Sequence, residues 1–298
     1  MLVAVTGSTG LIGTALVRRL TGEGHQVLRL VRSRPQGPQQ AHWDPAAGRI
    51  DAGALAGADA VVHLAGKSLG DNLRWTRRVK RELLQSRVEG TGLLAETIAG
   101  LDDGPRVLVC ASGINYYGDR GDELLTEQSA SGQGFLAEVC RRWEAAADPA
   151  RAAGIRVVHL RTALVQAADG LLARQFLLFR LGLGGRLGSG RQWWSWIALD
   201  DEVGLYQHAL ATAELEGPVN AAAPNPVTNA EHAATVARVL RRPALLHVPE
   251  FGPRLLLDGL ADELLFASMR VLPEVALASG YRFGFPELEP ALRHALAP

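Results

Sequence analysis

The N-terminal stretch LVAVTGSTGLIG, Leu2–Gly13, constrains the fold of this chain more than any other segment. Its apolar first half is typical of a buried strand, and it leads into Gly7, Gly10 and Gly13 at three-residue spacing. A helix is expected to follow at once, because apolar side chains then recur on one helical face. These side chains are Leu11, Ile12, Ala15, Leu16 and Leu20.

This predicted strand, turn and helix would suit a dinucleotide. Glycines let the backbone turn tightly and approach a pyrophosphate, and free N–H groups at the positive end of the helix attract its charge. An ordinary glycine-rich turn is the alternative. The expected cofactor contacts in this segment are Gly7, Gly10, Leu11, Ile12 and Gly13.

Strand-like and helix-like segments then alternate along the first half of the chain. Apolar runs of strand length are Gln26–Val31, Ala41–Asp44, Ala60–Leu64, Arg106–Ala111 and Ile155–Leu160. Longer segments with helical character are Leu73–Ile98 and Phe135–Ala153. Strict alternation predicts an α/β fold with a Rossmann-like, doubly wound parallel sheet, whose ligands bind outside the carboxyl ends of the strands.

The pattern changes after Val165. Leu171–Leu183 is expected to form an apolar helix. The glycine-rich segment Gly182–Gly190 is expected to be a mobile covering loop, with a second phosphate cradle as the alternative. Asp200 and Asp201 are expected to open a further helix, in which Asp201 is a cap rather than a catalytic acid.

The C-terminal part is expected to alternate helices with short strands. After a strand at Gly217–Ala221, the predicted elements are a helix at Asn229–Arg241, a strand at Leu245–Val248, helical stretches within Arg254–Met269 and a last helix from Pro286. We therefore predict two domains. Residues 1–222 would bind the dinucleotide, and residues 223–298, with a contribution from about 170–190, would form a smaller α/β substrate lobe that could close over it.

Arg32 follows the second strand and bears on the choice of cofactor. An acidic residue here would hold the ribose 2′-hydroxyl of NAD, whereas Arg accommodates the 2′-phosphate of NADP. The sequence therefore favours NADP, although basic residues are also common in solvated loops. At the end of the strand Ala60–Leu64, the small residues Ala65 and Gly66 would let the dinucleotide lie across the sheet edge, and His63 is interpreted as a core histidine.

The long helix carries cations where a core-facing stripe is expected. Arg77, Lys80 and Arg87 fall on or beside the stripe that includes Leu84 and Ile98. Cations are costly there unless they meet an anion or water. We predict that they face the cofactor or an anionic substrate; the alternative is that their long side chains reach solvent.

Hydroxyl groups follow the strand Arg106–Ala111, at the same edge of the sheet. Ser112 and Tyr117 could there polarise a carbonyl and relay a proton beside a nicotinamide, although buried tyrosines are also routine packing residues. Further on, three tryptophans crowd into Trp193–Trp196. This density suggests a substrate wall or a domain seam, with packing alone as the simpler explanation.

The composition limits the partners. The 298 residues are 47% hydrophobic and carry no net charge, which argues against a role based on nucleic acid or a membrane surface. No uncharged apolar run approaches the roughly 20 residues that span a bilayer, and the N-terminus opens straight into a strand. Cys110 and Cys140 fit a reducing compartment, and no metal-ligand spacing is present. We expect a cytoplasmic monomer or homodimer that acts on an unidentified small molecule.

With these motifs in place, the chain resembles the short-chain dehydrogenase/reductase superfamily, of the extended, epimerase-like kind. It is most similar to the NAD-dependent epimerase family proteins that end in a C-terminal domain of unknown function of their own. The resemblance covers essentially the whole chain. It rests on TGSTGLIG at Thr6–Gly13, HLAG at His63–Gly66, RWT at Arg74–Thr76, SRVEGT at Ser86–Thr91, YYG at Tyr116–Gly118, FLAEVCRRWEAA at Phe135–Ala146, GLGGRLGSGRQ at Gly182–Gln192 and NAAAPNPVTNAE at Asn220–Glu231.

The resemblance implies a Rossmann-like domain that binds NADP. The positions that look like the family's cofactor contacts are Arg32, Leu64, Ala65, Glu82, Arg87 and Val165. Glu82 enters on the resemblance only, because the helical periodicity places it on the outer face of its helix.

The chain also departs from the superfamily's pattern. In place of the catalytic Tyr, followed four residues later by Lys, it has Phe135 and Val139, neither of which can move a proton. Asn115 stands where Gly usually precedes the YYG turn, and Ala198 stands where the family's WIH segment has His. The usual Tyr/Lys mechanism and the substrates of better-known epimerases are therefore not carried over.

The leading hypothesis is an NADP-dependent oxidoreductase or epimerase that exchanges a hydride with a small carbonyl or hydroxyl compound. Ser112 and Tyr117 would be its hydrogen-bonding acids, and Arg87 or Lys80 would supply positive charge. The alternative, favoured by the missing Tyr/Lys pair, is a non-catalytic NADP-binding sensor or scaffold.

Overall fold

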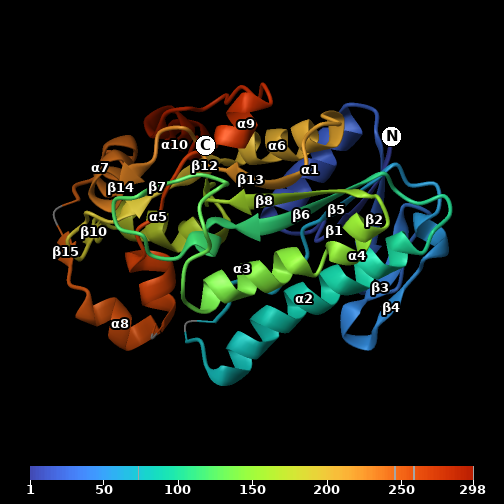
Figure 1. Cartoon of the computed structure of the whole chain (residues 1–298). Coiled ribbons are helices and arrows are strands. Elements are labelled where there is room, and N and C mark those ends of the chain that lie inside the picture. Colours follow the sequence, from blue (N-terminus) through green and yellow to red (C-terminus); the bar gives the residue numbers. More distant parts are fainter. Residues whose placement is uncertain (73, 245, 258, 298) are drawn as a thin grey trace.

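The computed structural model describes residues 1–72, 74–244, 246–257 and 259–297 (Figure 1). At its centre is an eight-stranded sheet with the order β13-β8-β6-β5-β1-β2-β3-β4. The strands are β1 Leu2–Thr6, β2 Gln26–Val31, β3 Gln40–Asp44, β4 Arg49–Ile50, β5 Ala60–His63, β6 Val107–Gly113, β8 Arg156–Thr162 and β13 Gly217–Ala221. Each predicted strand of this sheet is confirmed to within two residues at either end, whereas β4 was not predicted.

The sheet is doubly wound, as predicted. All its neighbouring pairs are parallel except β3 with β4. The chain runs outward from β1 through β2 and β3, returns to the other side of β1, and continues through β5, β6, β8 and β13. The carboxyl ends of β1 and β5 flank this reversal, which is where open α/β sheets bind their ligands.

Helices cover both faces of the sheet (Figure 1). One face is covered by α1 Leu11–Gly22 and α6 Leu199–Ala211, and the other by α2 Arg77–Ala99, α3 Phe135–Ala145 and α4 Asp148–Ala152. No helix within the described ranges is both long enough and apolar enough to span a membrane.

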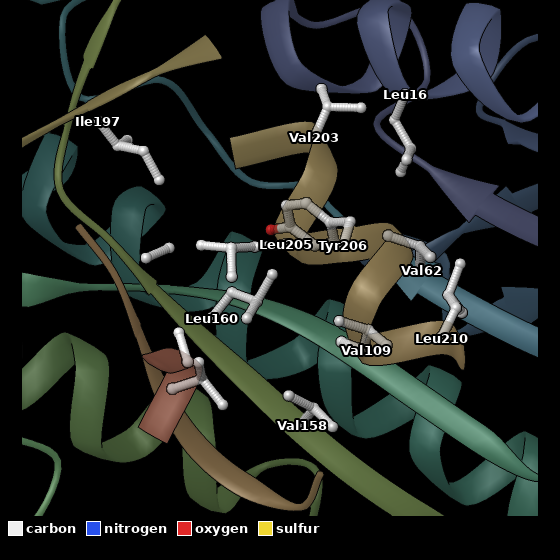
Figure 2. Close-up of a cluster of buried hydrophobic side chains, with 14 of the residues drawn as sticks. Leu16, Val62, Val109, Val158, Leu160, Ile197, Val203, Leu205, Tyr206 and Leu210 are labelled. Carbon is white, nitrogen blue, oxygen red and sulfur yellow. The ribbon is translucent and has the colours of Figure 1, made fainter. Parts of the chain in front are cut away.

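Two hydrophobic cores result from the alternation of side chains along the strands. Val62 and Val109 point to one face, where they belong to the same core as Leu16 of α1 and Tyr206 of α6 (Figure 2). Val61, the neighbour of Val62 in β5, belongs to the second core, on the side of α2 and α4. Strands that are buried on both faces account for the continuous apolar runs in the sequence.

The helix predicted over Leu73–Ile98 is α2, but it begins later, at Arg77. Thr76 caps it, because its hydroxyl oxygen accepts a hydrogen bond from the N–H of Val79 at 3.3 Å. Leu73 lies outside the described residues.

Of the three cations predicted to face inward from α2, only Arg87 is buried. Its residue is 8% exposed, whereas Lys80 is half-buried and Arg77 is exposed. In the second half of the helix the predicted stripe is buried at Thr91, Ala95 and Ile98, whereas in the first half Leu84 and Val88 are half-buried and Leu83 and Arg87 are buried instead. The exposure of Arg77 favours the alternative that its side chain reaches solvent.

The helix predicted over Phe135–Ala153 is two helices, α3 and α4. The first ends at Ala145, and Pro149 lies in the first turn of the second. Proline lacks the N–H that a continuous helix needs at that position, which explains the break.

The glycine-rich segment Gly182–Gly190 is not the continuous loop that was predicted. It contains β10 Gly185–Leu187, which pairs in parallel with β15 Leu246–Val248. A Cβ on the first residue of β10 would lie 1.8 Å from the carbonyl oxygen of Leu246, so glycine is needed for the two strands to approach. The preceding helix, α5 Ala173–Arg180, is shorter than predicted and follows a short 3-10 turn.

Asp201 does not cap α6, whose N-cap position is Ala198. Its carboxylate instead accepts hydrogen bonds from the N–H groups of Gly284 (2.7 Å) and Phe285 (2.9 Å) and from the hydroxyl of Tyr281 (3.3 Å). The prediction failed because these partners come from a distant part of the chain. Asp201 ties that C-terminal segment to α6.

The C-terminal segment contributes to three hydrophobic cores, one of which joins Leu260 to Leu83 and Leu136. Its helices are α7 Asn229–Leu240, α8 Phe251–Leu257, the π-helix Ala261–Phe266, α9 Glu274–Ala278 and α10 Leu288–Ala295. The predicted helical stretch within Arg254–Met269 is thus divided, the last helix begins two residues later than predicted, and Leu245 lies outside the described residues. Phe176 of α5 packs with Val236 of α7 in a third core, whereas Met269 joins the core beneath α1 and α6.

Short strand pairs connect these parts. They are β9 Leu164–Gln166 with β12 Trp196–Ala198, β11 Trp193–Trp194 with β14 Val227–Thr228, and β7 Leu124–Leu125 with β16 Arg270–Val271.

Candidate functional site

The glycine turn between β1 and α1 is a close-packed cradle at the carboxyl edge of the sheet. Gly7 has a φ of 65°, in the left-handed region, and a Cβ there would lie 2.8 Å from the carbonyl carbon of Leu64. A Cβ on Gly13 would lie 2.2 Å from the carbonyl oxygen of Gly7. A side chain at either position would therefore fill the cradle or push its walls apart.

The first turn of α1 leaves its N–H groups available at this cradle. The N-cap residue, Gly10, has no side chain, and the first turn contains no acidic residue. Leu11 and Ile12 begin the helix, whose N-terminal N–H groups lack acceptors within it. Such a helix end attracts an anion and fits the pyrophosphate of a dinucleotide.

Thr6 ties the end of β5 to the turn. Its hydroxyl oxygen accepts hydrogen bonds from the N–H groups of Leu64 (3.0 Å) and Ala65 (3.1 Å), and it lies 2.8 Å from Nδ1 of His63. Burial, with a smaller contribution from the Arg87 cation, lowers the pKa of His63 to about 4. His63 is therefore a neutral core residue, as predicted, and Leu64 and Ala65 are held beside the glycine cradle.

Three other predicted cofactor contacts, Arg32, Glu82 and Val165, differ in their exposure and in their partners. Arg32 is exposed directly after β2, the neighbour of β1. Glu82 on α2 is bound by Lys67 (2.6 Å) and Arg78 (2.7 Å), which lower the pKa of its carboxyl to about 2. Val165 is half-buried in β9. Glu82 therefore anchors the loop after β5.

Arg87 brings a buried cation close to the end of β5. Its Nη1 donates to the carbonyl oxygens of Lys67 (3.0 Å) and Leu83 (3.1 Å), and its guanidinium lies 4.9 Å from the ring centre of Trp143. A Cβ on Gly66 would lie 3.4 Å from the guanidinium carbon. Within the described ranges no carboxylate pairs with Arg87, so this cation is suited to an anionic or carbonyl ligand.

A cavity of about 330 Å³ lies beside Arg87, at the carboxyl ends of β6 and β8. Ile12 of α1, Ser112 of β6 and Thr162 of β8 contribute to its wall. The rest of the wall is mainly apolar and includes Leu136, Val139, Trp143, Trp193, Trp194 and Met269. Part of the tryptophan segment therefore lines a cavity wall, one of the roles considered for it.

Ser112 and Tyr117 belong to one buried hydrogen-bond network centred on Arg161. Ser112 Oγ donates to Glu144 Oε1 (2.7 Å), and Arg161 donates to both oxygens of that carboxylate (2.9 and 2.8 Å). Arg161 also donates to the Tyr117 hydroxyl (3.0 Å), which donates to Asn220 Oδ1 (2.7 Å). Burial alone would raise the pKa of the Glu144 carboxyl, but the Arg161 guanidinium brings it below its ordinary value. The proton of Ser112 is therefore directed to an anion.

Tyr117 does not line the cavity. Its side chain is fully buried, and this burial raises the pKa of its hydroxyl to about 12. Its position does not support the predicted role as an acid toward a substrate, because its hydroxyl is already engaged by Arg161 and Asn220. Ser112, by contrast, is part of the cavity wall.

Thr162 is a second hydroxyl in the cavity wall, and the sequence analysis missed it. Its Oγ1 lies 2.7 Å from Oε1 of Glu202 on α6, whose Oε2 has no hydrogen-bond partner among the described residues. Glu202 is fully buried, and burial raises the pKa of its carboxyl to about 8. Glu202 is therefore mainly neutral at pH 7. Nothing in the segment LDDEVG distinguishes it from the two acidic residues before it.

The residues at the positions of the superfamily's Tyr and Lys, Phe135 and Val139, are apolar and pack in largely apolar surroundings. Val139 is 2% exposed and lines the cavity. The ring of Phe135 packs edge-on against Trp75, with centroids 5.8 Å apart, and Lys80 Nζ lies 5.2 Å from the Phe135 ring centre. Neither position therefore offers the cavity a proton donor.

Known proteins share this architecture. Residues 3–222 match the NAD dependent epimerase/dehydratase family, and residues 248–295 match a domain of unknown function (DUF1731). An epimerase family protein of Mycobacterium bovis is 42% identical over 294 residues, which cover 98% of this chain and 97% of the relative. The crystal structure of the human epimerase family protein SDR39U1 (isoform 2) with NADPH has a TM-score of 0.90 and 35% identity, over 100% of both chains.

A more distant structure shows the fold alone. UDP-N-acetylglucosamine 4-epimerase from Bacillus cereus has a TM-score of 0.77 at 18% identity, over 99% of this chain and 98% of its own. The family match spans more than half of the chain and includes the glycine cradle and both strands that border the cavity. The chain therefore belongs to the NAD-dependent epimerase/dehydratase family.

Proposed function

We propose that this protein binds NADP along the carboxyl edge of the sheet and exchanges a hydride with a small carbonyl or hydroxyl compound in the adjoining cavity. The observation that carries this proposal is the cradle of Gly7 and Gly13 at the N-terminus of α1. Arg32 lies on the β2 side of the cradle, and the cavity lies on the side of β6 and β8. A dinucleotide laid across the edge would reach both.

Two observations support NADP over NAD. Arg32 is exposed at the end of β2, where a cation accommodates the 2′-phosphate. The human relative, 35% identical over its full length, was crystallised with NADPH. In this proposal Arg87, Leu64, Ala65 and the other predicted contacts surround the rest of the cofactor.

The chain's own residues would hold the reacting oxygen and move a proton. When bound, the cofactor supplies or accepts a hydride. Thr162 can give its hydroxyl proton to a substrate oxygen, because Glu202 carries a proton that can replace it. Ser112 directs its own proton to Glu144, so its oxygen is free to accept a hydrogen bond from a substrate. Ser112 and Thr162 thus replace the predicted pair of Ser112 and Tyr117.

NADPH absorbance, followed with a panel of small ketones and aldehydes, tests this function. We expect oxidation with at least one member, and a rate roughly a hundredfold lower in Thr162→Val, which keeps the shape but removes the hydroxyl. Tyr117→Phe should leave the affinity for ketone unchanged. If NADPH binds but no member of the panel oxidises it, hydride transfer to this class of compound is refuted.

The second candidate function is a non-catalytic NADP-binding sensor or scaffold. Phe135 and Val139, at the positions of the usual catalytic pair, favour it. In that case, NADPH would change the protease sensitivity or the oligomeric state of the protein without being consumed. The same preparations, compared with and without NADPH by limited proteolysis and light scattering, separate the two functions.

A further inference from the structure

Several polar groups in the cavity wall are already used by the protein itself. Ser195 Oγ donates to the carbonyl oxygen of Met269 and accepts from the N–H of Val271, both at 2.8 Å. Asn115 Nδ2 donates to the carbonyl oxygen of Glu263 at 3.2 Å. Ser195 therefore has little capacity left for a ligand, whereas the second N–H and the side-chain oxygen of Asn115 have no hydrogen-bond partner among the described residues.

The tryptophans of the wall also turn their polar atoms to the protein. Each of the three indole N–H groups has an acceptor within the chain, so the rings offer the cavity mainly carbon. The bonds run from Trp143 to Thr91 Oγ1 (2.9 Å), from Trp193 to Asp122 Oδ1 (2.8 Å) and from Trp194 to the carbonyl oxygen of Leu265 (3.3 Å). Leu136, Val139 and Met269 extend this apolar wall.

Apart from the Asn115 amide and from Arg87, which the proposed function assigns to the cofactor, the capacity that remains lies at the ends of β6 and β8. Ser112 gives its proton to Glu144 and can only accept a hydrogen bond from a ligand, whereas Thr162 can donate to a ligand oxygen when the protonated Glu202 donates to it. The two strands are neighbours, and Thr162 is paired with Gly113, the residue after Ser112. Because side chains alternate along a strand, Ser112 points to the side of α3 and Thr162 to the side of α6, so one ligand oxygen is expected to meet Thr162 alone.

We infer that the cavity takes a small, largely apolar carbonyl or hydroxyl compound, which presents its oxygen to Thr162 and buries its carbon skeleton against the tryptophans. This inference rests on the proposed function for its chemistry and adds the substrate class. A volume of about 330 Å³ is at the lower end of ligand sites and, with a nicotinamide also present, leaves room for a small molecule only.

The same wall disfavours a sugar nucleotide. A sugar carries a hydroxyl on most of its carbons, and each one buried here without a partner would weaken binding about tenfold. An apolar skeleton has no such cost and gains by leaving water.

Binding can be measured apart from turnover. The protein, saturated with NADP⁺, is titrated with cyclohexanone, with 4-phenylbutan-2-one and separately with UDP-glucose. An oxidised cofactor and a ketone do not react with each other, and the three tryptophans of the wall report binding by fluorescence. We expect saturation with a ketone in the millimolar range or below, and none with UDP-glucose at the same concentrations.

Two cavity variants and one surface variant locate the binding. Ala267→Leu fills the cavity, and Val139→Thr keeps the shape of the wall but adds a hydroxyl. We expect about tenfold weaker ketone binding in the first and a severalfold loss in the second. Leu177→Thr, at an exposed position of α5, should change nothing. If Ala267→Leu does not fold, the loss of ketone binding in Val139→Thr still tests the site.

The outcomes separate the substrate class from the proposed function. Ketone binding that both cavity variants weaken, without any NADPH oxidation in the panel, would uphold the ligand class and refute hydride transfer. Saturable binding of UDP-glucose that the same variants weaken would overturn the inference, as would the absence of ketone binding by NADP⁺-loaded protein.

Discussion

Around β1 and β5 the carboxyl edge of the sheet is shaped by backbone, whereas around β6 and β8 it is shaped by buried polar side chains. In the first region Gly7 and Gly13 form a cradle that no side chain could share. In the second, Ser112 and Thr162 are held by carboxyl groups from helices. The glycine turn of the first region is formed by residues close together in sequence and packs against Leu64, whereas the side chains of the second region are held by partners that only the fold brings together.

Within the second region, the carboxyl groups that hold the two hydroxyls differ in their ionisation. Ser112 meets Glu144, which is paired with Arg161 and ionised, whereas Thr162 meets Glu202, which has no cationic partner among the described residues and keeps its proton. The surrounding charge, and not the type of carboxyl, thus decides which hydroxyl can pass on a proton.

The largest effect is expected from Glu144→Ala. The substitution leaves Arg161, whose side chain is 4% exposed, without its carboxylate, and should lower the free energy of unfolding by about 3–5 kcal/mol. Denaturant unfolding at pH 7 measures it. The double variant Glu144→Leu with Arg161→Met removes both charges and should recover much of the loss. If Glu144→Ala costs less than about 1 kcal/mol, the pair does not hold this region together.

Glu202→Gln should change how stability depends on pH. Between about pH 4.5 and pH 8 the unfolded chain has released the Glu202 proton that the folded protein keeps, so the free energy of unfolding falls as pH rises. Relative to Glu202→Gln, the wild-type protein should lose about 1.4 kcal/mol per pH unit between pH 5 and pH 7. Parallel unfolding curves at these two pH values are the check. Identical pH dependence in the two proteins would mean that Glu202 is ionised in the fold.

Gly13→Ala tests the backbone region, with Gly22→Ala on the same helix as its matched control. The new Cβ at position 13 would lie 2.2 Å from the carbonyl oxygen of Gly7, whereas no atom lies within 4 Å of one at position 22. We expect NADPH binding to weaken about thirtyfold in Gly13→Ala, because relieving this overlap costs about 2 kcal/mol, and to stay unchanged in Gly22→Ala. Equal affinities in the two variants would place the cofactor elsewhere.

The contrast between the two regions explains what the sequence could predict. The strand Leu2–Thr6, the tight glycine turn into a helix and the core role of His63 depend on local patterns, and all three are confirmed. Glu202 was missed because its contact with Thr162 joins residues 40 positions apart. Ser112 and Tyr117 follow the same strand, but sequence does not show which hydroxyl faces the cavity and which is taken up by Arg161.

Glycine has two different structural roles in this chain, and the sequence alone did not distinguish them. At Gly7 it permits a left-handed turn beside β5, as predicted. At Gly185 it permits close strand pairing, so a segment that was predicted to be a loop contains β10. A glycine in the sequence indicates either an unusual backbone conformation or a close contact with another backbone segment. At Gly185 the choice is decided by the partner strand, which lies more than fifty residues further along the chain.

The central claim, that the sheet edge binds NADP, is tested most directly by titrating NADPH and NADH into the wild-type protein and into Arg32→Glu. We expect the wild-type protein to bind NADPH at least about tenfold more tightly than NADH, and Arg32→Glu to abolish this preference by weakening NADPH binding alone. Equal affinity for the two cofactors in the wild-type protein, or an equal loss for both in Arg32→Glu, would contradict the claim.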